Sequence, residues 1–170
     1  RVVAGIVEAT RRFRPGLPTE RSTTMGAIIS RVQLDKIERY VRLGREQGAT
    51  LACGGERPND PALANGYFMP PTVFTGVTQQ MRIAQEEIFG PTTALIPVRD
   101  VDEAIRVSNG IEYGLSSSIF TRDVNTAFRA MRDLEAGITY INAGTIGAEV
   151  HLPFGGTKGP GNGHREAGQA

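Results

Sequence analysis

Two amphipathic segments occupy the first part of the chain. Residues 1–13 place apolar side chains on one face of a helix, and the proline-containing segment 14–18 is expected to end it. Ser30 followed by Gln33 has the spacing of a capping box, which predicts a second helix from Ser30 to about Gln47. The apolar positions expected to face a core are Val3, Ile6 and Val7 in the first helix and Val32, Ile37, Tyr40, Val41 and Leu43 in the second.

Extended segments follow these two helices. Residues 50–53 are a short apolar run that predicts a strand, and residues 54–66 form a polar loop that contains glycine and proline. Residues 67–74 are expected to be extended, because the pair Pro70-Pro71 cannot lie inside a helix.

The clearest periodicity lies in the second half, where three apolar strand patterns alternate with two helical ones. The strands are expected at 93–98, 115–121 and 138–142, and the helices at 100–109 and 123–134. This order, with its short connections, predicts parallel βαβ units with right-handed crossovers and therefore an α/β fold. Ligands of such sheets bind at the carboxyl ends of the strands, so Asn142 and the loop after it are expected beside a ligand.

The composition narrows the class of protein. The chain has 170 residues, 39% of them hydrophobic and 22% charged, which is typical of one soluble globular domain. The net charge is +1 and no basic stripe is present, which argues against nucleic acid and anionic membranes as partners. No apolar run reaches the roughly 20 residues of a membrane span. A single cysteine cannot form an internal disulfide, which fits the reducing cytoplasm as the location.

Residues 85–91, with the sequence QEEIFGP, are the most specific pattern in the chain, and we call them the glutamate motif. By itself, a pair of glutamates before an apolar residue and a Gly-Pro turn is typical of the start of a strand. An ionised carboxylate can also accept two hydrogen bonds from a sugar diol, so one of the two glutamates could face a ligand. The residues alone leave both interpretations open.

Residues 153–158, with the sequence PFGGTK, are a second pattern, which we call the glycine motif. Its glycines permit backbone shapes that residues with a β-carbon avoid. It is not a phosphate-binding loop, because no Gly-Lys-Ser/Thr follows at the required spacing. The glycines that follow the motif, at 159, 161 and 163, are not a Rossmann fingerprint either, because their spacing is wrong.

The two motifs together make the chain resemble the aldehyde dehydrogenase superfamily, whose NAD(P)-dependent enzymes oxidise aldehydes to acids. The resemblance covers nearly the whole chain and implies that residues 1–170 are the later part of the α/β catalytic domain. In that family the second glutamate of the motif binds the nicotinamide ribose, and the phenylalanine packs against that end of the cofactor. By position these residues are Glu87 and Phe89, and the implied cofactor is NAD or NADP.

Two residues of the second helix match further cofactor contacts of the family. Gln33 and Lys36 have the spacing of a glutamine and a lysine that lie near the same ribose. Gln33 could instead serve the cap of its helix, and Lys36 could be solvated surface.

The aldehyde side of the resemblance involves the glycine motif and the loop 143–152. Phe154 is implied to line an apolar pocket that excludes water. The loop takes the position of a substrate-facing loop and resembles that of semialdehyde dehydrogenases, whose substrates carry a distal carboxylate. In this interpretation Thr145, Gly147 and Ala148 offer a hydroxyl and backbone N–H groups to that carboxylate, and the alternative is an ordinary loop between a strand and a helix.

The groups that perform the family's chemistry are not matched in this sequence. The cysteine nucleophile, the general-base glutamate, the oxyanion-hole asparagine and the dinucleotide-binding domain would all lie upstream, so the chain alone is expected to be an inactive fragment. Cys53 is not expected to be the nucleophile, because no thiolate-stabilising group lies near it in the sequence. No metal site is expected, because His151 and His164 have no partners at ligand spacing.

Three functions remain open. The first is a fragment of an NAD(P)-dependent aldehyde dehydrogenase that oxidises an aldehyde or semialdehyde through a cysteine thiohemiacetal and assembles, when complete, as a homo-oligomer, either a dimer or a tetramer. The second is a natural truncation that acts as a non-catalytic interaction module. The third is a CoA-acylating or acyl-phosphate reductase of the same architecture, which the glutamate motif disfavours.

Overall fold

The computed structural model describes residues 1–147 and 153–160. The chain forms two compact units, Arg1–Pro97 and Val98–Ala170. Ala148, one of the residues predicted at the substrate loop, lies outside the described ranges. Within those ranges, no helix combines the length and the apolar character needed to cross a membrane.

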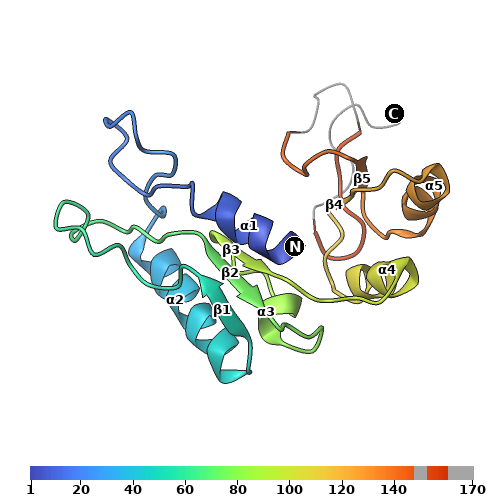
Figure 1. Ribbon diagram of the computed structural model, residues 1–170, viewed down its shortest axis with the longest axis horizontal. Coiled ribbons are helices and arrows are strands. Elements are labelled where there is room, and N and C mark those ends of the chain that lie inside the picture. Colours follow the sequence, from blue (N-terminus) through green and yellow to red (C-terminus); the bar gives the residue numbers. More distant parts are fainter. Residues whose placement is uncertain (148–152, 161–170) are drawn as a thin grey trace. The chain divides into compact units, whose positions relative to one another are not determined.

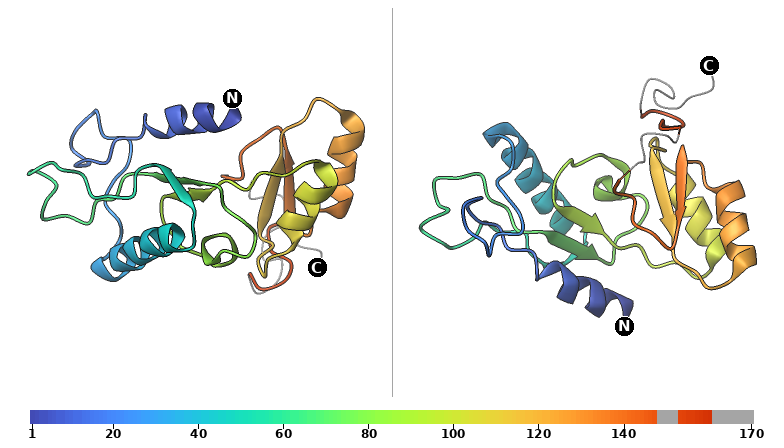
Figure 2. Two further views of the ribbon diagram at one scale, coloured as in Figure 1. Left: turned by 60° about the horizontal axis from the view of Figure 1, so that its bottom comes forward. Right: turned by 90° about the horizontal axis from the view of Figure 1, so that it is seen from above.

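The first unit is a three-stranded sheet with helices on both faces (Figure 1). Its elements are α1 (Val2–Thr10), α2 (Arg31–Glu46), β1 (Thr50–Cys53), β2 (Thr72–Thr75), α3 (Arg82–Gln85) and β3 (Thr92–Ala94). β1 pairs antiparallel with β2, and β2 pairs parallel with β3, so β2 is the central strand. α1 lies over one face of the sheet, and α2 and α3 lie over the other (Figure 2).

The core of the first unit lies between α2, α3 and the sheet. Its buried members are Leu34, Ile37, Tyr40, Val41, Ala49, Met69, Phe74, Val77, Ile83 and Ile88. The ring of Phe74 packs so closely on α2 that a β-carbon at Gly44 would lie 3.0 Å from it. Because Ile88 belongs to both this core and the glutamate motif, the motif is tied to α2 by hydrophobic contact as well as by sequence.

Helix α2 begins where the sequence predicts, and most of its apolar stripe is confirmed. The Ser30 hydroxyl accepts a hydrogen bond from the Gln33 N–H at 3.2 Å. Val32, however, was wrongly assigned to the core, because it is 80% exposed whereas Leu34 is fully buried. At 3.6 residues per turn, Leu34 shares the face of Ile37 and Val32 lies on the far side.

Helix α1 is shorter than predicted and its apolar face is only half-buried. It ends at Thr10 rather than near residue 13, and Ile6 and Val7 are partly buried while Val3 is exposed. An open apolar groove of about 450 Å³ is lined by α1 and by residues that include the segment from Ala94 to Pro97.

The second unit is a two-stranded parallel sheet with both of its helices on one face (Figure 2). Its elements are α4 (Val101–Asn109), β4 (Ser116–Ile119), α5 (Val124–Asp133) and β5 (Ile138–Ile141). The strands pair in register from Ser116 opposite Ile138 to Ile119 opposite Ile141. Both helices begin at the aspartates that the sequence indicates, since Asp100 accepts from the Glu103 N–H at 2.8 Å and Asp123 from the Thr126 N–H at 2.8 Å.

The α/β fold class is confirmed, but the strand pairing differs in part from the prediction. The unit β4–α5–β5 is parallel as expected. Within the first unit, β3 pairs with β2. The parallel pair β2–β3 was not predicted, because the helix in its connection, α3, has only four residues and leaves no periodic signal.

We expect Gly137→Ala to destabilise the second unit. A β-carbon at Gly137 would overlap the carbonyl oxygen of Gly155, and such overpacking typically costs about 1–3 kcal/mol. Denaturant unfolding of the two variants should show this loss for Gly137→Ala only. Gly144→Ala is the matched control, because a β-carbon there meets nothing within 4 Å, and its effect should stay within about 0.5 kcal/mol. Equal unfolding free energies for Gly137→Ala and Gly144→Ala would contradict the close packing of Gly137 on Gly155.

Candidate functional site

The glutamate motif connects α3 to β3 in the first unit, and its side chains alternate between the core and solvent. Glu86 follows α3 with an extended backbone. Ile88 is buried, whereas Glu87 is exposed and Phe89 is 73% exposed. The motif therefore presents one carboxylate and one aromatic ring to solvent from consecutive outward positions.

Glu86 is held by two protein groups. Arg82, one turn earlier on α3, donates to its carboxylate from Nε at 2.5 Å and from Nη2 at 2.9 Å. The Tyr40 hydroxyl, from α2, donates to the same carboxylate. The hydrogen bonds from Arg82 and then from Tyr40 lower the pKa of Glu86 to about 2. This glutamate is a structural anchor that stays ionised in neutral solution.

Glu87 contrasts with its neighbour. Its carboxylate forms no hydrogen bond or ion pair with any residue that the structure describes, and the side chain is exposed. An ionised carboxylate has lone pairs for several donors, so this group is available to bind hydroxyls of a ligand. Of the two glutamates, only Glu87 has the freedom that the predicted ribose contact requires.

Phe89 adopts a backbone conformation that is unusual for a bulky residue, with φ of 55°. The Gln33 side-chain amide supports it by donating to the carbonyl oxygens of Ile88 at 2.9 Å and Phe89 at 2.7 Å. Phe89 borders an open pocket of about 190 Å³, which is also lined by Glu86, Ile88, Gly90 and residues of β3. Gln33 thus holds the motif in place, whereas its contact with a ribose stays a prediction.

Lys36 lies on the same side of α2 as Gln33 and Tyr40. It is half-buried, and its ammonium nitrogen lies 5.9 Å from the centroid of the Tyr40 ring. The Arg39 guanidinium lies 5.5 Å from that ring. Lys36 therefore lies on the helix whose residues hold the glutamate motif, and its contact with a ribose stays a prediction.

Sequence reasoning missed the anchor formed by Tyr40, Arg82 and Glu86. Arg82 and Glu86 stand four residues apart, which is a visible signal for an ion pair on a helix. Tyr40 was assigned only to the apolar stripe, and its hydroxyl contact lies 46 residues away in sequence. Cys53, which was not expected to be catalytic, is half-buried in β1.

In the second unit, Asn142 is a structural residue at the carboxyl ends of β4 and β5. Its side-chain oxygen accepts from the Thr121 N–H at 2.8 Å, and its amide nitrogen donates to the Thr121 carbonyl at 2.9 Å. Its backbone has φ of 54° and turns the chain out of β5. Asn142 thus fixes the start of the predicted substrate loop, and its place beside a ligand stays a prediction.

The described part of that loop is exposed. Thr145 has no hydrogen bond to any described residue, and Gly147 has φ of 93°, which favours glycine. The Tyr140 hydroxyl donates to the Gly147 carbonyl at 3.4 Å. An open cavity of about 490 Å³ at this edge is lined by Phe120, Thr121, Arg122 and Asn142.

The glycine motif is anchored at the opposite ends of the same strands. The Thr157 N–H donates to the carbonyl oxygen of Gly114, which precedes β4, at 2.9 Å. The Thr157 hydroxyl donates to the carbonyl oxygen of Glu135, which precedes β5, at 2.9 Å. The Lys158 ammonium donates to the Asn109 carbonyl at 2.6 Å and pairs with the Glu135 carboxylate at 2.7 Å. Phe154 is half-buried and does not line the cavity at the carboxyl ends, so its predicted contact with the aldehyde stays a prediction.

The whole chain, residues 1–170, matches the sequence profile of the aldehyde dehydrogenase family. A betaine aldehyde dehydrogenase of Mesorhizobium japonicum is 42% identical over 167 residues, which cover 98% of this chain and 34% of that protein. A 5-carboxymethyl-2-hydroxymuconate semialdehyde dehydrogenase of Escherichia coli is 46% identical over 154 residues, which cover 89% of this chain and 33% of that protein. The chain spans about a third of the length of the curated relatives it matches.

Solved structures give the same similarity. HpcC from Thermus thermophilus matches with a TM-score of 0.92 and 40% identity over 97% of this chain and 32% of its own. Betaine aldehyde dehydrogenase from Staphylococcus aureus, in complex with NAD+, matches with a TM-score of 0.88 and 34% identity over 92% of this chain and 31% of its own. These likenesses confirm the α/β fold class and the resemblance that the two motifs indicated.

The lowered pKa of Glu86 leads to an expected pH dependence of stability. Because its folded pKa of about 2 lies below the ordinary 4.5, ionised Glu86 stabilises the fold above about pH 4.5, and this contribution declines as the pH falls toward 2. Glu86→Gln should therefore be less stable than the parent at pH 6, by about 1 kcal/mol because solvent screens a side chain that is 36% exposed. Denaturant unfolding between pH 6 and pH 3 should show this difference shrinking.

Glu87→Gln provides the comparison for that measurement. It removes the adjacent carboxylate, which has no described partner, and should change the unfolding free energy by less than about 0.5 kcal/mol at pH 6. A Glu86→Gln difference that stays constant down to pH 3 would contradict the anchoring of Glu86.

Proposed function

The chain belongs to the aldehyde dehydrogenase family, and from this premise we propose that it is part of the catalytic domain of an NAD(P)-dependent aldehyde dehydrogenase. Within that enzyme it holds the nicotinamide end of the cofactor with Glu87 and Phe89. The loop after β5, together with Phe154, borders the aldehyde. The cysteine nucleophile and the general base are supplied by polypeptide outside these 170 residues.

Two adjacent glutamates support the cofactor half of the proposal. Glu86 is bound by Arg82 and Tyr40, whereas the Glu87 carboxylate is exposed and has no described partner. An exposed carboxylate beside an exposed aromatic ring suits the ribose and the ring of a nicotinamide nucleotide, because the first accepts hydroxyl hydrogen bonds and the second offers an apolar surface. The Staphylococcus aureus relative is a complex with NAD+.

NAD(P)+ supplies the hydride acceptor when bound. Glu87 would orient the ribose by accepting hydrogen bonds from its two hydroxyl groups, and Phe89 would limit the positions of the attached ring. Gln33 holds the motif through the carbonyl oxygens of Ile88 and Phe89, and Lys36 adds a positive charge on the same helix. Such orientation matters for rate, because hydride transfer needs the reacting atoms within roughly 3–3.5 Å.

The proposed substrate is an aldehyde that carries a carboxylate. Thr145, Gly147 and Ala148 would contact that carboxylate with a hydroxyl and backbone N–H groups. The edge of the sheet where their loop starts also carries Arg122, which forms no ion pair with a described residue. The Escherichia coli relative acts on a semialdehyde. We further propose that the complete enzyme is a cytoplasmic homo-oligomer, as the family membership suggests.

We expect Glu87→Ala, made in the complete enzyme, to weaken cofactor binding or slow hydride transfer more than tenfold. Each hydrogen bond to a charged group contributes roughly 1.5–3 kcal/mol, and this variant removes the carboxylate that accepts such bonds from the ribose. Cofactor titration and the absorbance of the reduced nicotinamide measure the two effects. Glu46→Ala is the control, because Glu46 is exposed at the end of α2 and has no described partner. Unchanged kinetics in Glu87→Ala would refute the assignment.

The carboxylate preference is tested with two aldehydes of equal chain length. A semialdehyde with a terminal carboxylate should have a kcat/KM about tenfold or more above that of the corresponding alkanal, since one charged hydrogen bond supplies that factor. Thr145→Val should reduce the ratio several-fold while leaving oxidation of the alkanal unchanged. A parent enzyme that prefers the alkanal would show that the loop does not bind a carboxylate.

A further inference from the structure

The backbone between α3 and β3 couples the direction of one glutamate to that of the next. Glu86 has φ of −110° and ψ of 146°, and successive side chains of an extended segment point to opposite sides. Glu86 is half-buried, Ile88 is buried, and Glu87 and Phe89 are exposed. A Glu86 side chain that is held toward the protein therefore directs the Glu87 side chain toward solvent.

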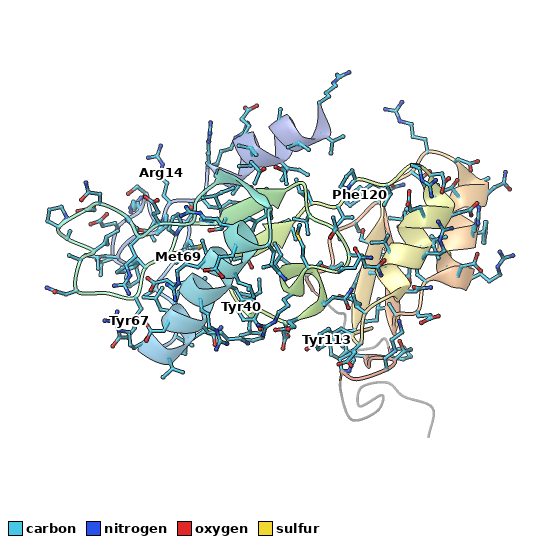
Figure 3. The ribbon with its side chains drawn as sticks, turned by 90° about the horizontal axis from the view of Figure 1, so that it is seen from below. Arg14, Tyr40, Tyr67, Met69, Tyr113 and Phe120 are labelled. Atoms are coloured by element: carbon cyan, nitrogen blue, oxygen red, sulfur yellow. The ribbon has the colours of Figure 1, made fainter. Side chains whose placement is uncertain are left out.

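Helices α2 and α3 fix Glu86 from two directions. Tyr40 projects from α2 toward the end of α3, where its hydroxyl donates to the Glu86 carboxylate (Figure 3). Arg82 grips the same carboxylate through two nitrogens at 2.5 Å and 2.9 Å. Two turns before Tyr40 on the same face of α2, Gln33 holds the carbonyls of Ile88 and Phe89. One helix therefore anchors both ends of the segment that carries Glu87.

The charges around Glu86 also keep the two glutamates in different roles. Arg82 pairs with Glu86, and the Arg39 guanidinium lies 5.5 Å from the Tyr40 ring. Because its carboxylate oxygens already accept protein hydrogen bonds, Glu86 does not compete with Glu87 for hydroxyls of a ligand.

We propose that Tyr40, Glu86 and Arg82 form a positioning network, whose function is to aim the Glu87 carboxylate and the Phe89 ring at the nicotinamide end of the cofactor. None of the three touches the cofactor in this account, and each acts through the backbone of the glutamate motif. The inference rests on the proposed function, because it assigns the purpose of the network to the cofactor that Glu87 binds.

The test compares Tyr40→Phe, Glu86→Gln and the double variant in the complete enzyme, at a temperature where all are folded. Each single variant should raise the Kd of the reduced cofactor roughly three- to tenfold, as the loss of one aiming hydrogen bond allows. The KM of the aldehyde should stay within about twofold, because the network lies at the cofactor end. The double variant should be little worse than the more severe single one, since both changes weaken the same network at Glu86. Tyr40→Phe removes a single oxygen atom and keeps the test valid if Glu86→Gln folds poorly.

Tyr67→Phe is the matched control, because the Tyr67 hydroxyl forms no hydrogen bond with a described residue, and this variant should change neither constant. Arg82→Lys keeps the charge but loses the second nitrogen that donates to Glu86. Its cofactor Kd should lie between those of the parent and Glu86→Gln.

Glu87→Ala separates this inference from the proposed function. If Glu87→Ala weakens the cofactor more than tenfold while the network variants lose only thermal stability, the network is structural and the positioning role is overturned. A parallel rise of the cofactor Kd and the aldehyde KM would also overturn it, as a general disturbance of the fold. If Glu87→Ala itself leaves the cofactor Kd unchanged, the cofactor assignment fails, and the positioning role fails with it.

Discussion

The Glu86 carboxylate, held between Arg82 of α3 and Tyr40 of α2, is the contact on which the candidate cofactor site depends. Because the backbone at Glu86 is extended, anchoring the Glu86 side chain toward the protein leaves the neighbouring Glu87 side chain exposed to solvent. Hydrophobic packing adds to the same constraint. A β-carbon at Gly90 would lie 2.5 Å from Ile37, which shows how closely the end of the motif is packed on α2. The position and the exposure of the Glu87 carboxylate thus depend on residues that do not themselves contact a ligand.

In the second unit, side chains that bond to backbone groups hold the loops at both ends of the two strands. The Asn142 side chain completes the hydrogen bonds of Thr121 at the carboxyl ends of the strands, and Thr157 and Lys158 do so for the carbonyls that precede the strands. The chain on both sides of the predicted substrate loop is therefore anchored. Such anchoring allows the described loop residues to remain exposed, because the loop's own contacts are not needed to fix its start.

Local signals in the sequence were sufficient for much of the fold. The helix starts at Ser30, Asp100 and Asp123 were predictable, because a capping side chain bonds to N–H groups within three residues. The parallel pair β4–β5 followed from the alternation of strand and helix. The pairing of β3 with β2 was not predictable in this way, since the connection between them contains only a short helix.

In the candidate site, too, the features set by local sequence were predictable and those set by long-range contacts were not. The glutamate motif itself indicated Glu87 and Phe89, but no local pattern announces the bond between Tyr40 and Glu86, which are 46 residues apart, or the positive φ of Phe89. Long-range contacts of this kind follow from packing of α2 on the sheet. They decide which of two identical side chains is free.

A crystal structure of the complete polypeptide with its dinucleotide bound tests the central claim most directly. The expected result is a Glu87 carboxylate within hydrogen-bond distance, about 2.6–3.2 Å, of the hydroxyls of the sugar beside the nicotinamide, with Glu86 still on Tyr40 and Arg82. A dinucleotide that lies far from Glu87, or one whose sugar is held by Glu86 instead, would contradict the account.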